Sequence, residues 1–331
     1  MSDGPDRTLT VAVIGCGAFG RNHARVYHEL AKSGEPVKLT GLVDVDRSRA
    51  DSLAREFECH AYSSVEELLS AGGVDAASVA VPTVHHAAVA RQLMQAGVDV
   101  LIEKPLTSTL AEADEVIELA DREKRIAQVG HLERFNPAVQ ATLPLITKPM
   151  FFEVHRLSVF TPRSLDVDVV LDLMIHDLDA VLAFVKSPVK EIRAAGLPIL
   201  SNKVDIANAR VEFESGCIAN FTASRVSTER VRKLRFFQAR QYISIDYAKQ
   251  SGAVITVGGA AGFATEQMTV TAAEPLQVQF EAFLNSVKTR EKPKLDGRTA
   301  RRTLEVAAAV LDRINQHAGV VSRTLASGWK P

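Results

Sequence analysis

The chain has 331 residues, a formal net charge of −1 and 46% hydrophobic residues. This length is enough for about two domains, each with its own core. The near-neutral charge argues against general nucleic-acid binding, and no run of about 18 apolar residues is present to span a membrane. The three cysteines are far apart (Cys16, Cys59 and Cys217), which fits reduced thiols in a cytoplasmic protein rather than disulfides.

A strand, a glycine-rich turn and a helix are predicted in succession over 9–14, 15–20 and 21–31. In the turn, GCGAFG, the first glycine permits a tight turn and the second lets a pyrophosphate approach the backbone. The third lets the helix pack closely on the strand. The amides at the helix N-terminus would then face the pyrophosphate. The expected cofactor contacts are Gly15, Gly17, Ala18, Phe19 and Gly20.

An acidic residue ends the next predicted strand, 37–43, at the position where dinucleotide-binding proteins recognise the adenosine ribose. Asp44 follows Gly20 by 24 residues, and its carboxylate is suited to accept hydrogen bonds from both ribose hydroxyls. This predicts NAD as the cofactor. Arg47 leaves NADP possible, because an arginine just past the acid can hold a 2′-phosphate.

Alternating strands and helices continue to about residue 130, which predicts an α/β Rossmann domain, a doubly wound parallel sheet, over 1–130. The further strands are expected at 74–81, 98–102 and 126–129. Ligands of such sheets bind at the carboxyl ends of the strands. Lys104 follows one of these ends, where its ammonium could stabilise a substrate oxygen or simply reach solvent.

The second half, 131–331, predicts an α+β domain whose mostly antiparallel sheet leaves one face open. We expect six strands, at 151–160, 189–195, 204–213, 216–226, 231–238 and 241–246. Two amphipathic helices, 276–288 and 297–317, could pack back on the first domain. Because an open sheet face usually needs covering, a homodimer or homotetramer is expected.

A predicted helix over 168–185 places Asp172 and His176 on one face, four residues apart among apolar neighbours. His176 has a pKa range suited to a general base, and Asp172 could orient it. The pair could equally be structural, tying the helix to the sheet. A metal site is not expected, because no third and fourth ligand follow at suitable spacing.

Together, five short patterns resemble the Gfo/Idh/MocA family of sugar and cyclitol dehydrogenases. They are GCGAFG at 15–20, Pro82 with His86, EKP at 103–105, RFNP at 134–137, and Asp172-x-x-x-His176-x-x-Asp179. The resemblance implies that Lys104 and His176 act on a substrate hydroxyl with help from Asp172. It also implies cofactor contacts from Pro82, Thr83, His86, Glu103 and Lys104. Met174 departs from the family pattern, which usually has glycine there.

The segments VGHLERFNP and DLMIHDLD are similar to a narrower group of that family, which oxidises the C3 hydroxyl of UDP-N-acetylglucosamine or its uronic acid. This likeness implies a nucleotide-sugar substrate, contacted by Lys104, His131, Arg134, Asn136 and His176. A diphosphate needs cations, which could be supplied by Arg156, Arg163, Arg225, Lys233 and Arg235. Each of these residues could instead be a surface charge or a subunit contact.

Three other functions remain open at this stage. A free sugar or inositol could replace the nucleotide sugar within the same chemistry. A non-catalytic, dinucleotide-sensing regulator would use the scaffold without needing Lys104 or His176, both of which are present. Reduction of an imine or a bilin would not need the Asp172 and His176 pair.

Overall fold

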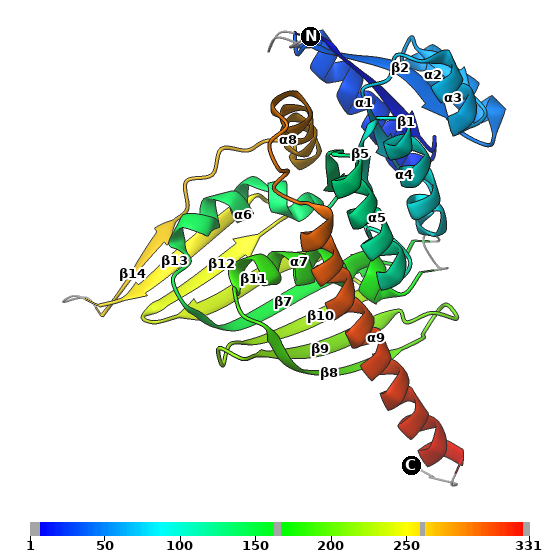
Figure 1. The fold of residues 1–331 in the computed structure, drawn as a ribbon. Helices are drawn as coiled ribbons and strands as arrows, with labels where there is room; N and C mark the ends of the chain where they lie inside the picture. The colour runs from blue at the N-terminus through cyan, green and yellow to red at the C-terminus, as the bar shows by residue number, and fades with distance from the viewer. Residues whose placement is uncertain (1–6, 162–166, 259–261, 327–331) are drawn as a thin grey trace. The chain divides into compact units, whose positions relative to one another are not determined.

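The computed structural model describes residues 7–161, 167–258 and 262–326. The chain divides into two compact units, the first formed by 1–131 with 274–302 and the second by 132–273 with 303–331. Each unit has its own sheet (Figure 1). Within the described ranges, no helix is both long enough and apolar enough to cross a membrane.

The first unit contains a six-stranded parallel sheet in the order β3-β2-β1-β4-β5-β6. This order is that of a Rossmann fold and confirms the predicted fold class. The strands are β1 Leu9–Ile14, β2 Val37–Val43, β3 His60–Tyr62, β4 Ala76–Val79, β5 Asp99–Ile102 and β6 Ala127–Val129. The helices are α1 Ala18–Lys32, α2 Arg47–Glu56, α3 Val65–Ala71, α4 His86–Gln95, α5 Leu110–Arg122 and α8 Pro275–Thr289.

The starts of α2 and α5 are set by capping side chains. Asp46 caps α2 by accepting from the amides of Ser48 and Arg49. At α5, Thr109 and Glu112 form a complete capping box, in which each side chain bonds the other's backbone amide. Such caps contribute about 1 kcal/mol each, so these boundaries follow from local sequence.

Helix α8 lies far along the chain but belongs to the core of the first unit. Phe280 and Phe283 are fully buried in a cluster with the apolar side chains of β1, β2 and α1. The Phe280 ring lies 4.5 Å from that of Tyr27 on α1. Burying a phenylalanine side chain contributes about 1.5–3 kcal/mol, which explains why this segment returns to the sheet.

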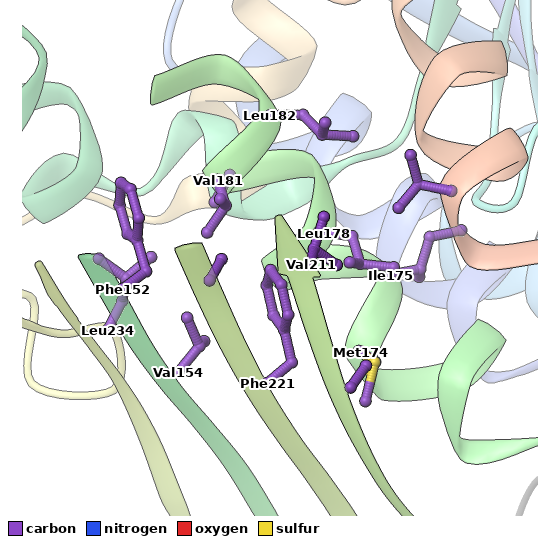
Figure 2. Packing of buried hydrophobic residues seen from close by; sticks show 14 of the residues in the cluster. Phe152, Val154, Met174, Ile175, Leu178, Val181, Leu182, Val211, Phe221 and Leu234 are labelled. Atoms are coloured by element: carbon purple, nitrogen blue, oxygen red, sulfur yellow. The ribbon is translucent and has the colours of Figure 1, made fainter. Parts of the chain in front are cut away.

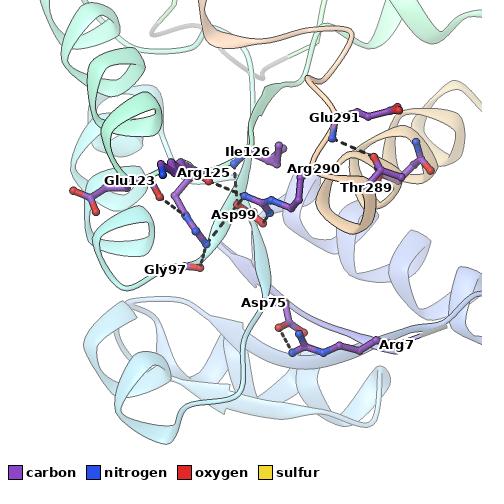
Figure 3. Close-up of polar contacts among 12 residues, drawn as sticks. Arg7, Asp75, Gly97, Asp99, Glu123, Arg125, Ile126, Thr289, Arg290 and Glu291 are labelled. Carbon is purple, nitrogen blue, oxygen red and sulfur yellow. Dashed lines mark hydrogen bonds and ion pairs between the residues drawn. The ribbon is translucent and has the colours of Figure 1, made fainter. Parts of the chain in front are cut away.

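An ion pair fixes the C-terminal end of α8 to the amino end of the sheet (Figure 3). The buried carboxylate of Asp99, at the start of β5, accepts from the Ile126 amide at 2.8 Å and from the Arg290 guanidinium. Arg290 also donates to the Lys124 carbonyl at 2.7 Å. This contact joins β5, the start of β6 and α8 at one point.

The second unit is built on an eight-stranded sheet in the order β14-β13-β12-β11-β7-β10-β9-β8. Every neighbouring pair is antiparallel except β7 and β10, as the predicted mostly antiparallel sheet requires. The strands are β7 Pro149–Val159, β8 Val189–Leu197, β9 Ile206–Phe213, β10 Ile218–Ser227, β11 Val231–Gln238, β12 Gln241–Asp246, β13 Ser251–Val257 and β14 Phe263–Gln267. Strands β13 and β14 were not predicted.

Helices cover one face of this sheet (Figure 1). They are α6 Pro137–Thr142, α7 Ile175–Phe184 and α9 Gly297–Ala326, whose residues from Thr303 onward belong to this unit. Under them, Phe152 stacks on Phe236 with ring centroids 5.2 Å apart, and Val154, Leu178 and Phe221 complete the core (Figure 2). The period-2 alternation of the strands sends their other side chains to the opposite face.

Candidate active site

The glycine-rich turn between β1 and α1 has the conformation that the sequence predicts. Gly15 has a φ of +98°, and a Cβ there would lie 2.6 Å from the Ala80 carbonyl oxygen. A Cβ at Gly20 would lie 1.7 Å from the Gly15 carbonyl oxygen, so only glycine lets α1 approach this closely. At Gly17, no atom of the described part of the chain lies within 4 Å of a Cβ position, which leaves room in front of the helix.

The surroundings of this turn fit a dinucleotide. Among the residues that the structure describes, no side chain caps the N-terminus of α1, so its amide groups are available to an anion. Large apolar side chains are exposed within five residues of the ends of three neighbouring strands, β1, β2 and β4: Phe19 at 54%, Val45 at 96% and Val84 at 67%. Apolar faces at the carboxyl edge of a parallel sheet suit the flat rings of adenine and nicotinamide.

Asp44 is fixed in place for ribose recognition. Its Oδ2 accepts from the Cys16 amide at 2.8 Å and its Oδ1 from the Asp46 amide at 2.9 Å. The cation beside it is Arg49, whose Nη1 lies 3.5 Å from Asp44 Oδ2. Arg47, the residue that the sequence suggested, instead pairs with Asp51, Nε to Oδ1, at 3.0 Å.

The sequence did not indicate Arg49, but a signal for it was present. Asp46 caps α2 and accepts from the amide of Arg49, the third residue of the helix, at 3.2 Å. This cap holds Arg49 near the end of β2. A cavity of about 320 Å³ beside the glycine turn is lined in part by Gly17, Arg21 and Arg49.

After β4, Pro82 is exposed and Thr83 is half-buried, whereas His86 is buried. The His86 ring is 1% exposed, with Nδ1 2.9 Å from the Pro105 carbonyl oxygen and Nε2 2.9 Å from that of Val81. Burial lowers the pKa of His86, against the effect of these two carbonyls. Both ring nitrogens therefore face backbone carbonyl oxygens, and the neutral ring can donate to one of them.

Lys104 is half-buried directly after β5, and its peptide bond to Pro105 is cis. The preceding carboxylate, Glu103, is directed toward α1, where its Oε1 lies 3.0 Å from His23 Nε2. Glu103 thus contacts a buried histidine of its own unit. His131, after β6, is buried.

In the second unit, Asp172 and His176 are both half-buried, but on different kinds of helix. Val170–Met174 is a single π-helical turn, and α7 begins only at Ile175. The helix predicted over 168–185 therefore contains a π-helical turn before its α-helical part. π-turns are frequent at functional sites. Met174, between the two polar residues, is 1% exposed and lies in the hydrophobic core (Figure 2).

Arg156 and Asn136 form part of a buried polar network in the second unit. Arg156 Nε and Nη2 donate to the two oxygens of Asp177 at 2.7 and 2.9 Å, and Nη2 also donates to Glu133 at 3.0 Å. The Asn136 side chain donates to Glu133 and to the Tyr247 carbonyl, and caps α6. Both residues hold this unit together, which differs from the substrate contact expected of them.

Of the other predicted contacts in this unit, Arg134 lies near Asp179, Nη1 to Oδ2, at 3.7 Å. Arg225 is 5% exposed and lies 3.5 Å from Asp205, Nε to Oδ1. It also donates to the Val167 carbonyl, so it ties two loops together. Arg163 lies outside the described residues. Over the described part of the chain, no cluster of three or more His, Cys, Asp or Glu could hold a metal ion.

Two family models match this chain. Residues 9–131 match the oxidoreductase family with an NAD-binding Rossmann fold, and residues 151–244 match the GFO/IDH/MocA C-terminal domain. The chain belongs to the Gfo/Idh/MocA family of oxidoreductases. Its first unit therefore contains the NAD-binding Rossmann domain of that family, in agreement with the glycine turn and Asp44.

Within the family, the chain is 37% identical over 308 residues to a UDP-N-acetylglucosamine 3-dehydrogenase of Acidithiobacillus ferrooxidans, covering 91% of this chain and 96% of that protein. A solved structure of that name and organism has a TM-score of 0.86 at 36% identity, covering 92% and 97%. A scyllo-inositol 2-dehydrogenase of Bacillus subtilis is 29% identical over 239 residues, covering 67% and 69%.

The predicted site residues fall within the two matched domains of the family. Gly15, Gly20 and Asp44 lie in its Rossmann domain, as does Lys104. Asp172 and His176 lie within its C-terminal domain. The sequence patterns found both sets, whereas Arg49 and the buried network around Arg156 emerged only from the tertiary structure.

Proposed function

We propose that this protein oxidises a sugar hydroxyl to a ketone with NAD as hydride acceptor, and that the hydroxyl is C3 of UDP-N-acetylglucosamine or a related UDP-sugar. The choice of substrate is supported by the 37% identity, along 91% of the chain, to a UDP-N-acetylglucosamine 3-dehydrogenase. The presence of Lys104, Asp172 and His176 at the positions of the family pattern supports the reaction type.

The cofactor would be held by groups of the first unit. The amides of Gly17, Ala18 and Phe19 at the start of α1 suit the pyrophosphate, and Asp44 suits the adenosine ribose. Pro82 and Thr83, after β4, complete this edge. When bound, the nicotinamide supplies the hydride acceptor, and the protein supplies placement and electrostatics.

We assign the proton chemistry to three side chains. A ring nitrogen of His176 takes the proton of the sugar hydroxyl, and Asp172, four residues earlier, orients the ring. The Lys104 Nζ donates to the same oxygen and stabilises its developing negative charge. A general base of this kind is worth about 10²–10⁴ in rate.

The test of these roles is a pair of variants, Lys104→Ala and His176→Ala, with their double variant. We expect each single variant to lower kcat at least about a hundredfold, while the dissociation constant for NAD stays within a factor of two. If both act on one hydroxyl, the double variant should lose much less than the product of the single losses. Near-wild-type turnover in both single variants would show that the chemistry lies elsewhere.

The test of the substrate compares UDP-N-acetylglucosamine, free N-acetylglucosamine and scyllo-inositol in one assay of NAD reduction, with a ketone trap. We expect turnover only with the UDP-sugar. Turnover of the cyclitol instead would favour the activity named for the Bacillus subtilis relative. NAD binding without turnover of any sugar would favour a regulatory protein.

We propose NAD rather than NADP as the preferred cofactor, because the carboxylate of Asp44 would lie where a 2′-phosphate must bind. Arg49 could partly offset this charge. The ratio of the two dissociation constants, measured by fluorescence titration, tests the preference. A tighter constant for NADP would overturn it.

We also propose a homodimer or homotetramer that uses the open face of the eight-stranded sheet. Phe151, Phe237 and Tyr242 form an aromatic row there, with ring centroids 6.0 and 5.0 Å apart along the row. Such a row at the surface suits a second copy of the chain. Light scattering on Phe237→Arg should show a smaller assembly than the wild type; a wild type that is monomeric would refute the proposal.

The three cysteines are free, as a reducing compartment requires. We therefore propose that the enzyme acts in the cytoplasm, which cell fractionation would test.

A further inference from the structure

Two buried polar side chains meet behind the turn that carries Lys104, and the proposed proton chemistry uses neither of them. His23, on α1, is fully buried, and the side chain of Glu103 is 12% exposed. His23 Nε2 lies 3.0 Å from Glu103 Oε1. Burying such groups is costly unless they are paired, and this contact supplies the pairing.

The Glu103 side chain makes two polar contacts and lies close to a glycine of β6's C-terminal end. Its Oε1 contacts His23 from α1, and its Oε2 accepts from the backbone amide of Lys104 at 3.2 Å. From the end of β6, Gly130 leaves it room, because a Cβ at Gly130 would lie 2.9 Å from Oε1. The side chain is therefore confined, and through the amide of Lys104 it confines the turn as well.

The carboxylate of Glu103 is ionised in this setting. Burial alone would raise the pKa of Glu103, but the hydrogen bond and charge of His23 and the nearby Lys104 ammonium outweigh it and lower that pKa. The titratable groups that interact with Glu103 include His23 from α1, His86 from α4 and Lys104 itself. A negative charge is thus fixed one residue from the amine that the reaction uses.

His23 has little freedom to do anything else. Its ring packs edge-on against Phe280 of α8, with ring centroids 4.9 Å apart. Among the described residues, its Nδ1 has no hydrogen-bond partner. Its Nε2 is therefore placed to donate to the Glu103 carboxylate.

We propose that His23 and Glu103 are positioning residues for Lys104. They fix the turn that carries it, and their pairing keeps a negative charge beside it. This inference rests on the role proposed for Lys104 above. His23 belongs to α1, the same helix whose N-terminal amides are proposed to bind the pyrophosphate. The pair therefore also links the proposed cofactor-binding end of α1 to the turn that carries Lys104.

The charge is tested with Glu103→Gln, which keeps the shape of the side chain. We expect kcat to fall about tenfold or more, with the dissociation constant for NAD within a factor of two. A wild-type kcat would overturn the proposal.

A second readout does not depend on activity. Acetylation of the Lys104 amine at one fixed pH is followed by mass spectrometry of its peptide, in wild type and Glu103→Gln. We expect the rate in the variant to differ from that of the wild type, because the carboxylate no longer fixes the turn through the Lys104 amide. Identical rates would overturn the proposed positioning role, whatever the outcome of the Lys104→Ala test of the catalytic role.

The contact between His23 and Glu103 is tested with two substitutions of His23. His23→Gln can still donate to Glu103, so its kcat should remain within about threefold of wild type, whereas His23→Leu should lose tenfold or more. Tyr27→Phe is the matched control, since it removes a buried hydrogen bond of α1, to Ser78 at 2.9 Å, away from Lys104. Equal losses of kcat in His23→Leu and Tyr27→Phe would reduce His23 to a general stability role and refute the proposal.

Discussion

The buried network around Arg156 offers a sharp choice between a structural and a substrate-binding arginine. Arg156 is 3% exposed and makes three hydrogen bonds to the carboxylates of Asp177 and Glu133. Burial opposes its charge, but these two carboxylates raise the pKa of the guanidinium. Burial in turn raises the pKa of Asp177, which Arg156 opposes. Each group is thus tolerated in the core only because its partner is there.

The perturbation is Arg156→Met, which keeps the apolar volume and removes the charge. Leaving a buried charge without its partner costs about 3–5 kcal/mol. In a unit of this size each kcal/mol lowers Tm by about 2–4 °C, so Tm should fall by roughly 6–20 °C. Adding Asp177→Asn should restore part of the loss, because the uncompensated charge is then removed.

The assay is thermal unfolding followed by circular dichroism, with Arg235→Met as control. Arg235 lies on the same sheet, but its ion pair with Glu153 is 3.8 Å long and about 40% exposed, so its loss should cost less than about 1 kcal/mol. An unchanged Tm in Arg156→Met, together with a tenfold rise in KM for the UDP-sugar, would refute the structural reasoning and restore Arg156 as a diphosphate ligand.

Three further predictions follow from single residues. Gly20→Val should weaken NAD binding more than about tenfold in a fluorescence titration, because its Cβ would overlap the Gly15 carbonyl; wild-type affinity would contradict this close approach. Although burial opposes ionisation, the Ser201 hydroxyl and nearby backbone amides lower the pKa of Asp205 to about 2. Asp205→Asn should therefore lose about 2 kcal/mol of stability in urea unfolding at pH 7, and the difference should vanish as the pH falls from about 4 to 2; a difference that persists at pH 2 would exclude this linkage. Burial, with a contribution from Asp44, raises the pKa of the Cys16 thiol to about 12, so iodoacetamide should alkylate it slowly at pH 7.5, and rapid labelling of the folded protein would count against its burial.

The first unit could be read from the sequence because its signals are local. The turn GCGAFG, the caps Asp46 and Thr109 and the apolar strands each act within a few residues. Strands β1 and β2 appear at the predicted bounds. Strand β3 was missed because its three residues are too few to show a period.

In the second unit, the alternation of apolar and polar residues was enough to predict most of the strands and the mostly antiparallel sheet, but not the roles of its charged side chains. Arg156 and Arg225 were expected to contact substrate because an arginine on a strand looks the same in sequence whether it faces solvent or core. Only the register of β7 on its neighbours sends Arg156 inward, where Asp177 and Glu133 meet it.

The sequence by itself therefore determined the Rossmann fold, the class of cofactor and the positions of Lys104, Asp172 and His176, since motifs at fixed spacing carry that information. Tertiary structure alone decided which partners surround them. It placed Arg49 rather than Arg47 beside Asp44 and set His23 against Glu103. These contacts join residues far apart in the chain, and burial and hydrogen-bond satisfaction select them only once the chain has folded.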